Sequence, residues 1–269
     1  MLGAIVGDIV GSRFEWANIH TKEFELFTDK CFVTDDSVMT LAVGEAIMDS
    51  EATGLDLSEA AVRAMRRRGQ EYPDKSYGGR FAGWLFARDP RPYNSYGNGS
   101  AMRVSPCGVA ARSLEEAIAL SRAVTEVTHN HPEGIKGAEA TAVAIWLART
   151  GASRDDIRAC IESQYYPLGF TLDEIRPTYR FNESCQGTVP QAIEAFLESE
   201  SFEDAIRNAI SIGGDSDTLA AITGGIAEAF YGIPETIRAT ALWYLDRTQK
   251  EILERFEKYA AKRPGAPAA

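Results

Sequence analysis

The sequence predicts one all-α domain of about a dozen helices over residues 1–262. Three observations support this fold class. Helix-start signals recur along the whole chain, no stretch shows the sustained alternation that strands require, and no linker or change of composition separates two domains. With 269 residues, the chain is long enough to bury a large core.

The first predicted helix covers residues 2–11 and carries glycines at positions 3, 7 and 11. On a helix this spacing places the glycines on one face, which lets another backbone approach closely. Asp8 interrupts the apolar residues, so the segment is neither a membrane dimerisation motif nor a signal peptide. Glu15 follows between Phe14 and Trp16, and taken alone it is interpreted as a solvated glutamate beside two packed rings.

Residues 34–37, Thr-Asp-Asp-Ser, come directly before a helical pattern over residues 38–48. Acids and hydroxyls at a helix start are favoured as caps and by the helix dipole. This start nevertheless has more oxygen atoms than a cap uses, and hard oxygen ligands are what Mg²⁺, Mn²⁺ or Ca²⁺ require. Capping and metal binding therefore both stay open for Asp35 and Asp36.

The next part of the chain alternates short helices with turns. An amphipathic helix is predicted over residues 57–69 and a short one over 81–87, with turn-rich segments of the kind that tend to be functional. Residues 97–103, Gly-Asn-Gly-Ser-Ala-Met-Arg, are predicted to open the next helix. Bare backbone N–H groups at such a start could bind an anion, although the motif is neither a dinucleotide fingerprint nor a P-loop.

The middle of the chain is predicted to be helical apart from one long loop. A capping box at 113–116 starts a helix that reaches about residue 128, and further helices cover 133–149 and a shorter stretch from 153. A zinc site at His129 and His131 is disfavoured, since no third soft ligand is near. For His129, a capping or packing role and a ligand contact both stay open. Residues 163–187 are predicted to be a long surface loop.

The C-terminal part is predicted to form helices over 189–198, 202–211, 217–231 and 235–259, followed by a disordered tail at 263–269. Two glycines, Gly213 and Gly214, lead into a second oxygen-rich helix start. Again, capping or metal binding would explain these side chains. If the fold brought both starts together, two adjacent hard cations would find their protein ligands there. The six candidate ligands are Thr34, Asp35, Asp36, Asp215, Asp217 and Thr218.

Composition restricts the partners and the location. The net charge of -11 argues against non-specific binding to nucleic acid or to an anionic membrane. The four cysteines form no C-x-x-C pair, which is typical of reduced thiols. No apolar run approaches the ~20 residues needed to span a bilayer. We therefore expect a cytoplasmic protein, and a monomer.

Several motifs together resemble those of the ADP-ribosylglycohydrolases, a family that includes the dinitrogenase-reductase-activating glycohydrolases. They are residues 34–37, 97–103, 128–129 and 213–218, in that order, and the resemblance extends from Leu2 to about Thr240. It implies a compact orthogonal bundle of helices around two Mg²⁺ or Mn²⁺ ions. The six candidate ligands match the metal ligands of that family, with Asp217 as the bridge. Ser37 and Ser216 depart from the frequent threonine, at positions not expected to ligate.

The resemblance also implies an activity and a substrate site. The metals would hold the distal ribose by its hydroxyls and polarise its anomeric carbon or orient a water, so that ADP-ribose is released from a modified protein. Gly78, with Gly79, is similar to a backbone contact region of the family. Phosphate and ribose contacts are implied for Ser95, Tyr96, Gly97, Asn98 and Gly99. Tyr96 and His129 would flank the adenosine by stacking.

Glu15 gains importance through the same resemblance. Residues 11–15 are similar to the mobile glutamate segment of the branch that removes O-linked ADP-ribose from serine and degrades poly-ADP-ribose. We therefore predict Glu15 to be an acid/base or metal-gating carboxylate, with Asp35 as the second catalytic residue. The predicted substrates are O-linked conjugates of serine, poly-ADP-ribose or O-acetyl-ADP-ribose.

Three alternatives remain at this point. The protein could remove N-linked ADP-ribose from arginine, because the metal site would grip the ribose and not the leaving group. It could be a non-catalytic ADP-ribose reader or a crystallin-like relative, although all six candidate ligands and Glu15 are present. A generic two-metal phosphatase is disfavoured because the chain has only three histidines, none near an acidic motif.

Overall fold

The fold is all-α, as predicted. The computed structural model describes residues 1–263, and over these residues it contains fourteen α-helices, three short 3-10 helices and no strand. None of the described helices combines the length and the apolar character needed to cross a membrane. The α-helices are α1 (Leu2–Gly11), α2 (Asp35–Thr53), α3 (Leu57–Glu71), α4 (Gly79–Phe86), α5 (Ser105–Ala110), α6 (Leu114–Glu126), α7 (Pro132–Arg149), α8 (Arg154–Gln164), α9 (Leu172–Ile175), α10 (Cys185–Leu197), α11 (Phe202–Ser211), α12 (Ser216–Tyr231), α13 (Glu235–Ala241) and α14 (Arg247–Ala260).

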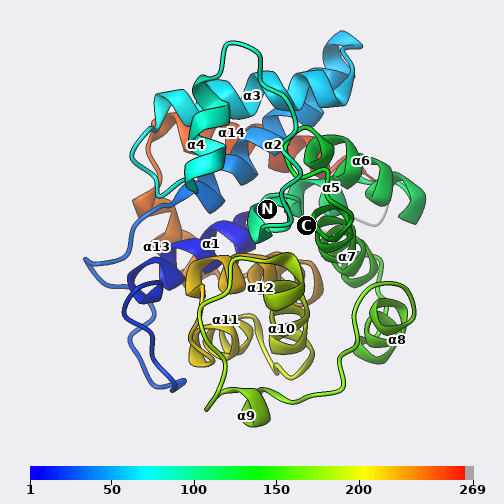
Figure 1. The fold of residues 1–269 in the computed structure, drawn as a ribbon. Helices are drawn as coiled ribbons and strands as arrows, with labels where there is room; N and C mark the ends of the chain where they lie inside the picture. The colour runs from blue at the N-terminus through cyan, green and yellow to red at the C-terminus, as the bar shows by residue number, and fades with distance from the viewer. Residues whose placement is uncertain (264–269) are drawn as a thin grey trace.

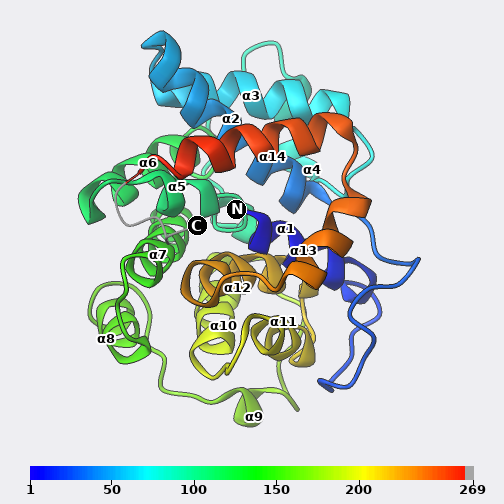
Figure 2. The same ribbon diagram turned by 180° about the vertical axis from the view of Figure 1, so that it is seen from behind.

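The first helix, α1, lies at the centre of the molecule. Figure 1 shows α10, α11 and α12 on one side of it and α2, α3 and α14 on the other, while α5 to α8 form a flank. Seen from behind, α14 crosses the back of α2, and α13 leads up to it from α12 (Figure 2). Every residue of α1 is buried, as its apolar sequence requires.

The glycine face of α1 is in contact with the backbone of α12. A methyl group at Gly7 would lie 1.9 Å from the carbonyl oxygen of Ala220, and one at Gly3 would lie 2.2 Å from that of Gly224. At Gly11, the nearest atom would be the Asp217 α-carbon at 2.5 Å. The prediction that this face admits another backbone is therefore confirmed, and the partner is the helix that carries the second acidic motif.

Several predicted boundaries were wrong because capping residues decide them. The predicted helix at 235–259 is broken, since Asp246 and Gln249 form a capping box that starts α14 anew. The surface loop predicted to reach residue 187 ends earlier, because Ser184 caps α10 at Cys185. That loop also contains the short helix α9.

Two further local predictions need correction. Residues 97–103 do not open a helix directly: they form a 3-10 turn, Asn98–Ser100, and α5 begins only at Ser105. The predicted capping box of α6 is half formed. Ser113 accepts a hydrogen bond from the Glu116 amide, but the Glu116 carboxylate accepts from the amide of Arg112.

The predicted tail at 263–269 lies outside the described residues, apart from Arg263. This residue is ordered against α14, because its guanidinium pairs with Glu51 and lies 4.3 Å from the Tyr259 ring centre.

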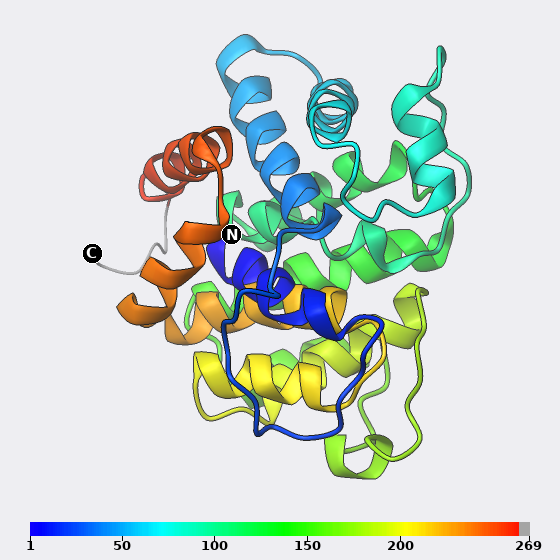
Figure 3. The ribbon, with the colours of Figure 1, turned by 90° about the vertical axis from the view of Figure 1, so that its left-hand side faces the viewer.

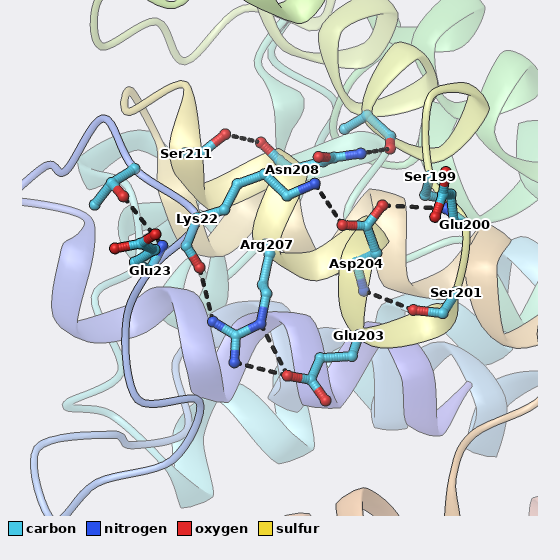
Figure 4. A network of polar contacts seen from close by, with 12 residues as sticks. Lys22, Glu23, Ser199, Glu200, Ser201, Glu203, Asp204, Arg207, Asn208 and Ser211 are labelled. Atoms are coloured by element: carbon cyan, nitrogen blue, oxygen red, sulfur yellow. Dashed lines mark hydrogen bonds and ion pairs between the residues drawn. The ribbon is translucent and has the colours of Figure 1, made fainter.

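A long segment, residues 15–34, leaves the end of α1 and passes over α11 before it reaches α2 (Figure 3). Arg207 of α11 holds it, because its guanidinium donates to the carbonyls of Lys22 and Phe24 at 2.8 and 2.7 Å. Glu203 orients the same guanidinium at 2.6 Å (Figure 4). The segment that begins with Glu15 is thus fastened to the body of the protein at its middle.

Candidate active site between two helix starts

A carboxylate from α1 holds the start of α2. Thr34 caps this helix, because its hydroxyl accepts a hydrogen bond from the Asp36 amide at 3.3 Å. The Thr34 amide and hydroxyl donate to Asp8 at 3.1 and 2.6 Å, and the Ser37 amide and hydroxyl donate to the same carboxylate. Since Thr34 supplies the cap, the Asp35 and Asp36 side chains are not needed for it.

Asp8 is a residue that the sequence reasoning did not place in the site. It is fully buried between α1 and the start of α2. A signal was available, because the glycine spacing predicts that α1 is covered by another backbone. An acid inside such a helix is buried, and a buried carboxylate requires partners.

The start of α12 is arranged differently from that of α2. Gly213 and Gly214 both have positive φ, 73° and 77°, which turns the chain sharply into the helix. Asp215 occupies the N-cap position but makes no side-chain capping bond. Its carboxylate instead accepts from Asn98 Nδ2 at 2.7 Å, which ties α12 to the glycine turn. Capping by Asp215, one of the two interpretations of the sequence, is therefore not what its side chain does.

The two helix starts converge. Oxygen atoms of Asp8, Asp36 and Asp217 lie within 4.8 Å of one another, and so do those of Glu15, Asp215 and Asp217. Asp217 belongs to both groups, and it is the residue for which the resemblance implies a bridging ligand. The hydroxyl of Thr218 lies 3.4 Å from Asp36 Oδ2, so the α12 start reaches the α2 start directly.

The cluster concentrates negative charge in a buried place. Burial is the largest cause of the raised pKa values, and neighbouring carboxylates add to it. The pKa values of Asp35, Asp36 and Asp217 lie well above the ordinary range. The pKa of Glu15 is raised to about 7 and that of Asp215 to about 6. Oδ1 of Asp36 is buried without a hydrogen-bond partner. A hard divalent cation would relieve both conditions, so these residues fit such a group.

A cavity of about 320 Å³ opens beside the cluster. Most of the residues predicted for the site line it: Glu15, Asp35, Asp36, Gly78, Ser95, Gly97, Asn98, Gly99, His129, Asp215, Asp217 and Thr218. Thr34 lies behind this wall, with its hydroxyl on Asp8. Tyr96 is half-exposed and is not among the lining residues.

His129 lies in the wall of the cavity beside an aromatic residue that the sequence reasoning overlooked. Its Nδ1 is 2.8 Å from the Thr128 hydroxyl, and its ring centre is 5.8 Å from that of Tyr93. Burial, with the charges of Arg103 and Arg80, holds the pKa of His129 well below its ordinary value. His129 does not cap α7, because His131 accepts the hydrogen bond from the Glu133 amide.

Tyr96 points to a different partner. Its ring meets that of His131 edge to face, with centres 5.3 Å apart. Tyr93, and not Tyr96, lines the cavity beside His129. The stacking role predicted for Tyr96 would suit Tyr93 equally well. The signal for Tyr93 was its place in the turn-rich segment before residue 97.

The anion-binding prediction for the glycine turn needs a correction. The Gly97 amide donates to Ser95 Oγ, that of Asn98 to the Glu183 carbonyl, and that of Ser100 to the Gly97 carbonyl. These N–H groups are therefore not bare, because the 3-10 turn and its contact with the segment before α10 use them. Sequence alone did not show that contact.

Positive charge in the cavity comes from two arginines instead. Arg80 and Arg103 both line it. Arg103 is fully buried, and burial lowers its pKa to about 10, so it still carries its charge at neutral pH. Its Nη2 donates to Thr128 Oγ1 at 2.7 Å. The lining therefore combines carboxylates that suit cations, which we call the acidic wall, with two guanidinium groups that suit an anion, which we call the basic wall.

Comparisons with known proteins identify the family of the chain. The family model described as ADP-ribosylglycohydrolase matches residues 1–265. The chain is 26% identical to ADP-ribosylhydrolase ARH3 of Homo sapiens, over 87% of this chain and 85% of that one. It is 29% identical to ADP-ribosylarginine hydrolase Tri1 of Pseudomonas putida, over 64% of this chain and 49% of that one.

A solved structure has the same fold. It is described as an ADP-ribosylglycohydrolase-related protein complex, and it superimposes with a TM-score of 0.71 over 96% of this chain and 94% of the other, at 23% identity. The family match covers nearly the whole sequence, including both acidic helix starts and the glycine turn. This chain belongs to the ADP-ribosylglycohydrolase family.

Proposed function

We propose that this protein is a divalent-metal-dependent hydrolase that releases ADP-ribose from modified side chains, with an O-linked conjugate such as ADP-ribosylserine as its substrate. The observation that carries the proposal is one cavity with an acidic wall and a basic wall. ADP-ribose requires both, because its hydroxyls can meet cations at one end while its diphosphate needs positive charge.

Different side chains of the cavity serve metal binding, diphosphate binding and adenosine binding. Bound cations, two Mg²⁺ or Mn²⁺ held by the carboxylates of both helix starts, would supply positive charge where the ribose bond is polarised. Arg80 and Arg103 offset the charge of the diphosphate. His129 stays neutral and, with Tyr93, gives the adenosine end an aromatic wall.

The preference for an O-linkage follows from the leaving group. A serine oxygen leaves well only if it receives a proton, whereas an arginine guanidinium already carries one and departs as a neutral guanidine. Glu15 lines the cavity, and its carboxylate oxygen lies within 4.8 Å of those of Asp215 and Asp217, which supports a role for Glu15 as the proton donor. An acid in this position is of most use to an O-linked substrate.

Arginine-linked ADP-ribose is the second candidate substrate. The similarity to ADP-ribosylarginine hydrolase Tri1 of Pseudomonas putida favours it, although that similarity covers a smaller part of this chain than the similarity to human ARH3. The acidic wall does not discriminate between the two linkages.

The test is to incubate the protein with serine-linked and arginine-linked ADP-ribosyl peptides, each with Mg²⁺ and with EDTA, and to measure free ADP-ribose. We expect Mg²⁺-dependent release from the serine-linked peptide, and loss of that release in Glu15→Gln. Faster release from the arginine-linked peptide would reverse the order of the two candidates. Release from neither peptide in the presence of Mg²⁺ would overturn the proposed function.

A further inference from the structure

One exposed side chain connects the Glu15 segment to the start of α12. The Asn18 amide group donates to the carbonyls of Phe14 and Glu15, at 2.6 and 3.0 Å, and to the carbonyl of Gly214 at 2.8 Å. Its Oδ1 accepts from the Gly214 amide at 2.8 Å. Asn18 therefore holds both polar groups of Gly214 and the backbone of Glu15 at the same time.

The turn that Asn18 holds is the one that aims Asp215. Gly213 and Gly214 both have positive φ, and neither has room for a side chain. A methyl group at Gly213 would lie 2.9 Å from the His20 ring, and one at Gly214 would lie 2.4 Å from the Tyr179 ring. The turn is thus enclosed between the Glu15 segment and Tyr179, and Asp215 follows it directly.

We propose that Asn18 is a positioning residue that sets Glu15 and the Asp215 end of the cation site relative to each other. The inference rests on the proposed function, because it concerns the same cavity. Oxygen atoms of Glu15, Asp215 and Asp217 come within 4.8 Å of one another from two separate segments. Asn18 links those two segments by side-chain hydrogen bonds in both directions, so its loss releases each carboxylate from the other.

Asn18 contributes little as a purely structural residue. It is exposed, and it lies in a segment without regular secondary structure. Arg207 holds the middle of the same segment independently, through the carbonyls of Lys22 and Phe24. Removing the Asn18 amide should therefore leave the fold intact, while groups that orient metal ligands typically change metal affinity or activity by about 10- to 100-fold.

The first test measures Mn²⁺ binding by calorimetry, without any substrate. We expect Asn18→Ala to weaken Mn²⁺ binding about 10-fold or more, with a thermal midpoint close to that of the wild type. Asn208→Ala is the matched control: this buried asparagine of α11 donates to the Ala195 carbonyl at 3.1 Å and does not line the cavity (Figure 4). It should lower the thermal midpoint and leave Mn²⁺ affinity unchanged.

The second test asks whether Asn18 acts through Glu15. At saturating Mn²⁺, kcat for the serine-linked peptide is measured for Asn18→Ala, Glu15→Gln and the double variant. We expect Asn18→Ala to lower kcat about 10-fold alone and to have no further effect when Glu15 is already replaced. Asn18→Gln, which keeps the amide but displaces it by one methylene group, should fall between the wild type and Asn18→Ala.

The outcomes separate the inference from the proposed function. If the wild type binds Mn²⁺ and Asn18→Ala binds it equally well with unchanged kcat, the role of Asn18 is overturned and the proposed function stands. Multiplicative losses in the double variant would overturn the coupling to Glu15. If the wild type does not bind Mn²⁺ at all, the proposed function fails, and the positioning role fails with it.

Discussion

Asp36 shows most directly what a single residue of the site contributes. One of its carboxylate oxygens is buried without a partner, and the other faces the Thr218 hydroxyl at 3.4 Å. Burial and the charges of Asp217 and Asp8 hold the pKa of Asp36 well above its ordinary value. In the absence of a cation, this carboxylate is therefore a source of instability, because a buried charge needs a partner.

Asp36→Asn should accordingly have opposite effects with and without metal. In EDTA at pH 7 the variant should be more stable than the wild type by about 1 kcal/mol, a rise in Tm of about 2–4 °C, because the cost of burying an ionisable carboxyl group among other acids is removed. The rise in Tm that the proposed Mg²⁺ site predicts for the wild type should disappear in the variant. Thermal unfolding followed by circular dichroism measures both effects.

Asp29→Asn, at an exposed turn, is the control. It should change neither the Tm in EDTA nor the rise in Tm on adding Mg²⁺. An Asp36→Asn variant that is less stable in EDTA would show that Asp36 stabilises the metal-free fold instead.

At the level of single residues, the sequence predicted side chains better than their partners. Asp35, Asp36, Asp215 and Asp217 could be named because acids at helix starts are visible in a sequence. Asp8 and Tyr93 had only indirect signals, because their roles depend on which helix covers α1 and on how the turn-rich segment folds back. The amides of the glycine turn were misjudged for the same reason, since their acceptors lie elsewhere in the chain.

Among the elements, the contact between α1 and α12 determines the geometry of the site. Asp8 extends from one helix and Asp217 from the other, and their oxygen atoms meet in one group. The two backbones approach so closely that a methyl group at Gly7 would lie 1.9 Å from the Ala220 carbonyl oxygen. Any increase in their separation would move the two carboxylates apart.

Gly7→Ala should therefore damage stability and the site together. We expect it to lower the free energy of unfolding by about 3 kcal/mol or more, because the added methyl group meets backbone that cannot give way. Gly83→Ala in α4 is the matched control, since a methyl group there meets nothing within 4 Å. That control should be neutral or stabilising by up to about 1 kcal/mol. Urea unfolding measures both, and an unaffected Gly7→Ala would contradict the packing described here.

A buried carboxylate, Glu45, joins α2 to α3. It accepts from Arg68 Nε and Nη2 at 2.9 and 2.8 Å and pairs with Arg67 at 2.9 Å. Burial alone would raise the pKa of Glu45, but the hydrogen bonds and charges of Arg68 and Arg67 outweigh it and lower the pKa below 4.5. A lowered pKa means that the stabilisation is present above pH 4.5 and is lost as the pH falls through the folded-state value.

Glu45→Gln should lower the free energy of unfolding at pH 7 by about 1–3 kcal/mol, because the two arginines lose their charged partner. The difference from the wild type should shrink as the pH falls below 4.5, since Glu45 itself then becomes neutral. Urea unfolding at a series of pH values from 7 to 3 measures it. A difference that stays constant over this range would show that the charge of Glu45 is not the cause.

The order and type of the helices followed from the sequence, whereas their ends depended on side-chain caps. The helices α1, α11 and α12 begin and end close to the predicted residues, because apolar periodicity and glycines mark them. The sequence did not predict the break between α13 and α14. Asp246 and Gln249 form the capping box there, and in an amphipathic pattern these polar residues resemble the solvent-facing side of one continuous helix. Short elements such as α9 carry too few residues for any period to appear.

For the whole molecule, the net charge of the chain has the same sign as the ligand that the cavity is expected to bind. The chain has a net charge of -11, but its cavity is expected to take an anionic diphosphate. The long-range field therefore repels the ligand that the local charges of Arg80 and Arg103 attract. The composition predicted the negative long-range electrostatic field, whereas only the fold could show that Arg80 and Arg103 line the cavity.

The rate of substrate capture should therefore rise with salt. Between about 10 and 150 mM ionic strength, kcat/KM for an ADP-ribosylated peptide of zero peptide charge should increase roughly twofold, because salt screens the long-range repulsion more than the buried contacts. Steady-state kinetics at constant pH and Mg²⁺ measures it, with sucrose of equal osmolality as the control. A fall with salt would show that the two arginines dominate the encounter as well as the bound state.

The exposed ring of Trp16 stacks on Phe181, with centres 5.0 Å apart, and so joins the segments that carry Glu15 and Glu183 at the rim of the cavity. Such a pair is worth about 1 kcal/mol, and it adds to the hydrogen bonds by which Asn18 and Arg207 hold the same segment. Both rings lie outside the helices. Widening the rim for a bulky conjugate would therefore displace side chains and loop backbone, without unfolding any helix.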